Sequence, residues 1–83
     1  MTKTITEGDF VQRSNSMLSE YNKFGAEKVP KGLSEKISRS LQGQGFKVQT
    51  NASNPNLFEI TTPSGNEWYR LKVKKYKLVV EKV

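Results

Sequence analysis

No cysteine and no histidine occur in this 83-residue sequence. Without cysteine, the chain cannot form the disulfides by which small secreted domains compensate for a thin core. Without histidine or a thiol, it lacks the commonest general base, the commonest metal ligand and the thiol nucleophile. These absences favour a binding protein over an enzyme, and they predict neither a cofactor nor a metal site.

Long apolar runs are also missing. No stretch approaches the ~20 apolar residues that a membrane-spanning helix requires. The first ten residues carry charges and lack the apolar segment of a signal peptide. We therefore expect a cytoplasmic protein without a membrane partner.

The carboxylates give no pattern typical of catalysis. Glu7 and Asp9 lie two residues apart at a predicted helix start, where they do not face each other and instead compensate the helix dipole. The acids at Glu59, Glu67 and Glu81 fall in predicted strands among many lysines, which favours cross-strand ion pairs. The sequence therefore predicts no enzymatic activity.

Apolar residues make up 34% of the chain and include four Phe, three Tyr and one Trp. A domain of this length buries only about 60% of the surface that its unfolded chain exposes. Large aromatic rings can dominate such a thin core. We expect residues 1–83 to form one folded domain.

The N-terminal half, about 7–44, has the periodicity of helices. Thr6 and Asp9 resemble a capping box, and apolar residues recur at steps of three, four and seven as far as Phe24, before Gly25. This pattern predicts a first helix near 7–24. A second helix is predicted from Ser34, as its cap, to the glycines that follow Leu41.

From Phe46 onward the apolar period changes to two, which predicts a β-meander over about 46–83. The predicted strands are 46–50, a second around Phe58 and Ile60, a third from Glu67 after a turn at 63–66, and a fourth near 77–82. The apolar parity shifts between Lys74 and Tyr76, so a bulge or a tight turn must lie there. Without Gly, Asn or Asp, an ideal two-residue hairpin is disfavoured at that point.

These elements predict an α+β domain with two N-terminal helices on one face of a three- or four-stranded antiparallel β-meander. The alternative is a winged-helix-like fold, which needs about three helices before its hairpin. The apolar last strand also allows a homodimer through an edge strand.

The formal net charge is +6, and its excess lies mainly in the C-terminal half. The densest basic run contains no acid; it comprises Arg70, Lys72, Lys74, Lys75 and Lys77. Strand alternation places Trp68 on the same face as Arg70, with Lys47 expected on that face of the first strand. The alternative position for Trp68 is over the sheet edge or under the helix connector.

Two functions follow from this face. Cations neutralise phosphates, and an exposed ring stacks on an unpaired base, so the first hypothesis is a nucleic-acid-binding (DNA or RNA) accessory protein with little sequence specificity. The second is a protein-binding module, such as a small inhibitor or adaptor that docks on an acidic or nucleic-acid-binding protein, because Trp and Arg are typical interface anchors.

Overall fold

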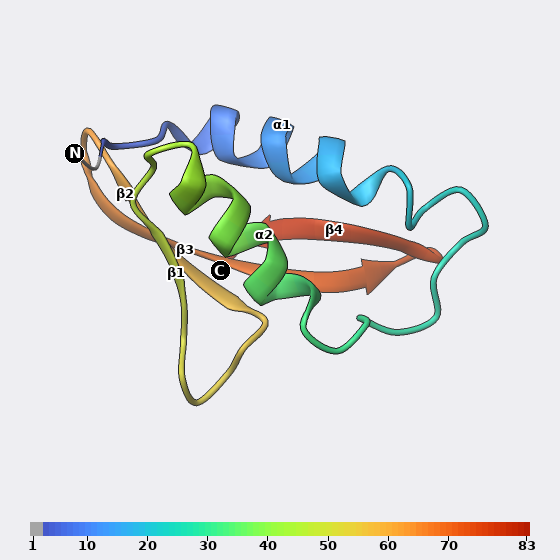
Figure 1. The fold of residues 1–83 in the computed structure, drawn as a ribbon. Helices are drawn as coiled ribbons and strands as arrows, with labels where there is room; N and C mark the ends of the chain where they lie inside the picture. The colour runs from blue at the N-terminus through green and yellow to red at the C-terminus, as the bar shows by residue number, and fades with distance from the viewer. Residues whose placement is uncertain (1–2) are drawn as a thin grey trace.

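The computed structural model describes residues 3–83. Within this range two helices precede a four-stranded sheet (Figure 1). The elements are α1 (Glu7–Leu18), α2 (Leu33–Gly43), β1 (Val48–Thr50), β2 (Leu57–Thr62), β3 (Gly65–Lys74) and β4 (Lys77–Lys82). The strands are antiparallel and lie in the order β1-β2-β3-β4. The predicted α+β architecture is confirmed, with four strands in the meander.

Both helices cover the same face of the sheet, α1 along β4 and α2 across β1 (Figure 1). At the centre of this layer, the ring centroids of Phe10 and Phe58 lie 5.5 Å apart and those of Phe10 and Tyr69 lie 5.0 Å apart. The rest of the core is aliphatic apart from Phe46: Ile5, Leu18, Leu33, Ile37, Leu41, Val48, Ile60, Leu71, Leu78 and Val80.

Helix α1 begins where the capping pattern predicts, because the backbone N–H of Asp9 donates to Thr6 Oγ1 at 3.1 Å. The predicted end near residue 24 is wrong, since the helix stops at Leu18. The segment after Leu18 turns, and its Asn22 side chain forms hydrogen bonds with the backbone of β4. As a result Phe24 is 97% exposed and does not continue the apolar stripe of α1.

Helix α2 starts one residue before the predicted cap. Gly32, in the left-handed conformation with φ +82°, occupies the cap position. Ser34 lies inside the helix and is buried, and its hydroxyl donates to Asn56 Oδ1 at 2.8 Å. The prediction of a Ser34 cap is therefore wrong, while the predicted stop at Gly43 is confirmed.

Strand β1 is shorter than the predicted 46–50 because the N-terminal segment pairs beside it. Phe46 forms an isolated parallel bridge with Lys3. The Lys47 N–H donates to the Lys3 carbonyl at 2.9 Å, and the Ile5 N–H donates to the Thr61 carbonyl at 3.0 Å. These long-range bonds add residues 3–5 to the sheet, where Ile5 is buried.

The β2–β3 and β3–β4 hairpins each have a two-residue turn. The turn after β2 consists of Pro63 and Ser64, so β3 starts at Gly65 and not at Glu67. The turn after β3 consists of Lys75 and Tyr76, which both adopt left-handed backbone with φ 52° and 64°. Our prediction that a two-residue hairpin is disfavoured there is wrong, although the predicted break in parity is correct.

Side chains form hydrogen bonds with backbone groups on both edges of the sheet. At the outer edge of β4, Asn22 Oδ1 accepts from the Leu78 N–H at 2.8 Å and Asn22 Nδ2 donates to the Leu78 carbonyl at 3.1 Å. On β1, the Val48 carbonyl accepts from Ser38 Oγ and Gln42 Nε2 of α2. Such cover discourages edge-to-edge pairing. The homodimer through an edge strand stays a prediction.

Candidate nucleic-acid interface

The face of the sheet opposite the helices carries the predicted site residues. We call it the open face, because α1 and α2 pack on the other side. Alternation along β3 places Trp68, Arg70, Lys72 and Lys74 on this face, and the register adds Lys77 opposite Lys74. The further members are Lys47, Gln49, Leu57, Glu59, Thr61, Asn66, Val79 and Glu81.

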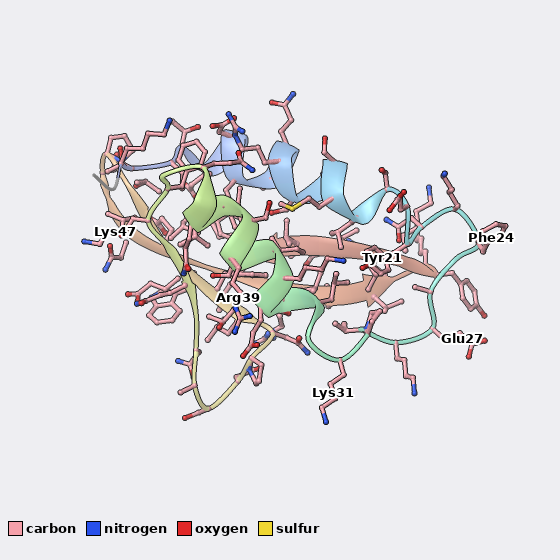
Figure 2. The ribbon with its side chains drawn as sticks, in the orientation of Figure 1. Tyr21, Phe24, Glu27, Lys31, Arg39 and Lys47 are labelled. Carbon is pink, nitrogen blue, oxygen red and sulfur yellow. The ribbon has the colours of Figure 1, made fainter. Side chains whose placement is uncertain are left out.

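Not all predicted site residues come together. Lys47 is exposed on the open face but lies just before β1, with β2 between it and β3. In Figure 2 it marks the end of the sheet opposite Phe24. Lys75 lies in the β3–β4 turn and not on a strand face. The compact basic group therefore consists of Arg70, Lys72, Lys74 and Lys77.

The basic run from Arg70 to Lys77 contains no acid in the sequence, but the fold brings an acidic side chain next to it. Glu81 of β4 lies opposite Arg70, and its carboxylate is 3.0 Å from Lys72 Nζ and 3.3 Å from Lys74 Nζ. Hydrogen bonds from Lys72 and then Lys74 hold the pKa of Glu81 below its ordinary value. These ion pairs are exposed, and exposed pairs are weak enough to be exchanged for a phosphate.

Two cations of the compact group form no ion pair among residues 3–83, namely Arg70 and Lys77. The guanidinium of Arg70 is free to present its planar fork of donors, which matches phosphate geometry. Counting Lys47 and Lys75, six cations and two carboxylates occupy the open face and its turn. The electrostatic character of this surface is therefore positive.

Trp68 is 38% exposed on the open face. Because Trp68 lies on the open face, on the opposite side of the sheet from α1 and α2, it does not pack under the helix connector. The cross-strand neighbour is Glu59, whose carboxylate accepts hydrogen bonds from Gln49 Nε2 at 2.6 Å and Asn66 Nδ2 at 3.1 Å. The side chain is partly covered by its neighbours, and the remaining part is exposed to solvent.

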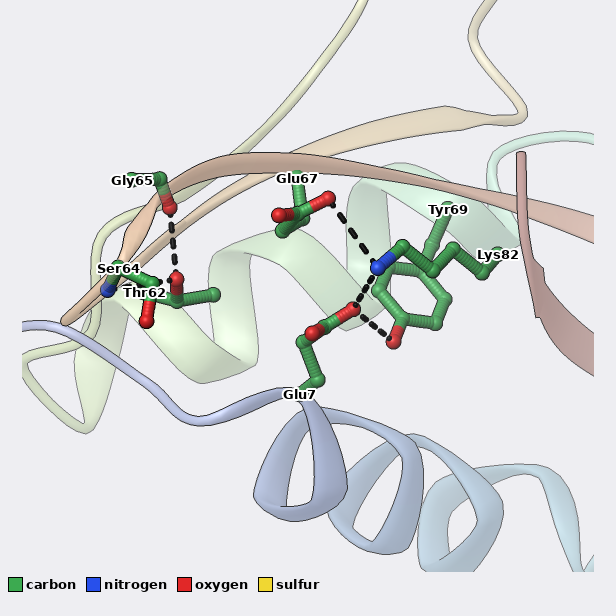
Figure 3. A network of polar contacts seen from close by, with 7 residues as sticks. All are labelled: Glu7, Thr62, Ser64, Gly65, Glu67, Tyr69 and Lys82. Carbon is green, nitrogen blue, oxygen red and sulfur yellow. Dashed lines mark hydrogen bonds and ion pairs between the residues drawn. The ribbon is translucent and has the colours of Figure 1, made fainter.

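The other face of β3 holds a polar cluster that the sequence did not reveal (Figure 3). Tyr69 Oη donates to Glu7 Oε1 at 2.8 Å, and Lys82 Nζ lies 2.9 Å from the same oxygen and 3.4 Å from Glu67 Oε2. Hydrogen bonds from Lys82 and Tyr69 lower the pKa of Glu7, and those to Glu7 and Glu67 raise the pKa of Lys82. The cluster ties the start of α1 to β3 and β4.

Ionisation of Tyr69 in this cluster is expected to lower the stability of the fold at high pH. Burial, followed by the hydrogen bond to Glu7, raises its pKa from 10.0 to about 12. The fold favours the neutral phenol, so its contribution is complete below pH 10 and is lost as the pH rises toward 12. The difference in tyrosinate absorbance between the protein and its Tyr69→Phe variant should show a midpoint near pH 12. A midpoint near pH 10 would contradict the burial and bonding of this hydroxyl.

Comparisons of the chain with protein-family models, curated proteins and solved structures give no match. Neither α1 nor α2 has the length and apolar character needed to cross a membrane. Within residues 3–83, no three acidic side chains gather into a group that could hold a metal ion. Any function of the open face is therefore inferred from the residues that it carries.

Proposed function

We propose that this protein binds nucleic acid through the open face, as a non-enzymatic accessory protein with little sequence specificity. The observation that supports the proposal is one sheet face on which Arg70, Lys72, Lys74 and Lys77 form a line of cations that starts beside a half-exposed ring, Trp68. The cations would contact phosphates, and the ring would stack on a base. Because phosphate contacts carry no sequence information, binding would depend mainly on charge.

A protein partner is the second candidate, and the acids on the open face favour it. Glu59 lies beside Trp68, and Glu81 lies between Lys72 and Lys74. A surface of mixed charge around an aromatic ring suits a protein interface, where Trp anchors binding and charges select the partner. In that case Trp68→Ala should weaken binding more than the loss of any single lysine.

The fluorescence of Trp68, the only tryptophan, provides the first test. Oligothymidylate added at low salt should quench this fluorescence, because the base would stack on the indole. With about four phosphate contacts, affinity should fall about fiftyfold between roughly 50 mM and 200 mM salt. The absence of both quenching and binding at low salt would refute the proposed function and favour the protein partner.

A further inference from the structure

Two aromatic rings that play no part in the core lie at the same end of the molecule. Phe24 is 97% exposed and Tyr76 is 70% exposed, whereas the other two tyrosines and three phenylalanines are buried or half-buried. Figure 2 shows the Phe24 side chain pointing away from the body, at the end where the β3–β4 hairpin turns. We call Phe24, Lys75 and Tyr76 the aromatic tip.

The two segments of the tip are in direct contact. A Cβ added at Gly25 would lie 3.6 Å from the Tyr76 carbonyl oxygen and 3.7 Å from Tyr76 Cβ. The Ala26 N–H donates to the same carbonyl at 2.6 Å, and Asn22 binds the backbone of Leu78 just beyond the turn. The segment after α1 therefore holds the hairpin turn in place, and Phe24 directly precedes the glycine that contacts Tyr76.

The hairpin turn is strained. Both Lys75 and Tyr76 have left-handed backbone, which glycine or asparagine adopts with little penalty and a lysine or tyrosine does not. Strained backbone of this kind persists where the surrounding structure fixes it, and it is concentrated at functional sites. Here the hydrogen bonds from Asn22 and Ala26 supply the constraint. They present Lys75 and Tyr76 in a fixed conformation that loses little entropy when a ligand binds.

The tip continues the open face. Lys74 and Lys77, which flank the turn, belong to that face, so a line of cations along β3 extends from Trp68 to the turn that contains Tyr76. At about 3.3 Å per residue this line is roughly 25 Å long, a distance that suits a short single strand. A duplex hides the faces of its bases within the stack, whereas a single strand exposes them to aromatic side chains.

We infer that the nucleic acid bound by this protein is single-stranded, that its backbone follows β3, and that it stacks bases on Tyr76 and Phe24 of the aromatic tip. This inference rests on the proposed function. An anionic membrane is the other ligand that exposed rings among lysines suit. It would engage the tip alone and leave Trp68 and Arg70 without a role, so the continuity with the open face favours the single strand.

The test compares two double variants. Phe24→Ser with Tyr76→Asn removes both rings, and asparagine suits the left-handed turn, so the melting temperature should stay equal or rise. Phe24→Tyr with Tyr76→Phe keeps both rings and is the matched control. The affinity for oligothymidylate should fall about fivefold or more per ring in the first variant and stay within about twofold in the second. The affinity for duplex DNA should change by less than about twofold in both.

The outcomes separate the inference from the proposed function. If the unmodified protein binds oligothymidylate and the ring-free variant binds it equally well, the inference is refuted and the proposed function stands. If the unmodified protein binds no nucleic acid at low salt, both are refuted. Vesicles of phosphatidylcholine and phosphatidylserine complete the test. Vesicle binding that requires the two rings, without oligothymidylate binding, would assign the tip to a membrane surface and overturn the inference.

Discussion

Replacing Arg70, Lys72 and Lys74 together by glutamate is expected to lower the affinity for nucleic acid on the order of a thousandfold at low salt. Each charge-assisted hydrogen bond to a phosphate is worth roughly a factor of ten or more. The reversed charges would also repel the phosphates, together with Glu81, which already lies among these side chains. The salt dependence of any residual binding should become shallower, because fewer counterions are released. Fluorescence anisotropy of a labelled oligonucleotide measures both effects.

A matched control distinguishes the effect of where the reversed charges lie from the effect of the change in net charge. Lys28, Lys31 and Lys36 are exposed on the helix connector and on α2, away from the open face. Reversing these three lysines changes the net charge by the same amount. A much smaller loss of affinity is expected in this variant. Equal losses in the two triple variants would mean that overall charge, and not the open face, governs binding.

The second large effect concerns stability. Phe58→Ala should destabilise the fold by about 3 to 5 kcal/mol, because it removes a fully buried ring from the centre of the core. Domains have only about 5 to 15 kcal/mol of stability in total, and one of this size belongs near the lower limit. Much of the variant should therefore be unfolded at room temperature. Circular dichroism during denaturant titration measures the change.

Phe24→Ala is the natural control for this prediction, since the same substitution removes a ring that is 97% exposed. Its effect on the free energy of unfolding should stay within about 0.5 kcal/mol. Similar losses from Phe24→Ala and Phe58→Ala would contradict the placement of the two rings.

The local signals in the sequence predicted much of the fold. Thr6 and Asp9 mark the start of α1 as capping chemistry predicts, and Gly43 ends α2. The alternation of polar and apolar residues placed Trp68 and Tyr69 on opposite faces of the strand, because a strand has only two faces, although it left open whether Trp68 is covered. These features depend on neighbouring residues, which a single sequence displays directly.

The features that the sequence did not predict depend on contacts between distant segments. Helix α1 stops early because Asn22 bonds to Leu78, far along the chain. The same contact and the Ala26 hydrogen bond hold Lys75 and Tyr76 in a turn that their residue types disfavour. Glu81 enters the basic group only when β4 folds back on β3. Local patterns cannot reveal which distant residue will supply such a bond or charge.

Amide chemical-shift mapping by NMR tests the central claim most directly, since it locates the bound ligand without altering the protein. Oligothymidylate added to isotope-labelled protein should shift the amide signals of β3 from Trp68 to Lys74 and the indole N–H of Trp68. Signals of α1 and α2, on the opposite side of the sheet, should change little. Shifts concentrated on the two helices, or the absence of shifts at low salt, would contradict binding through the open face.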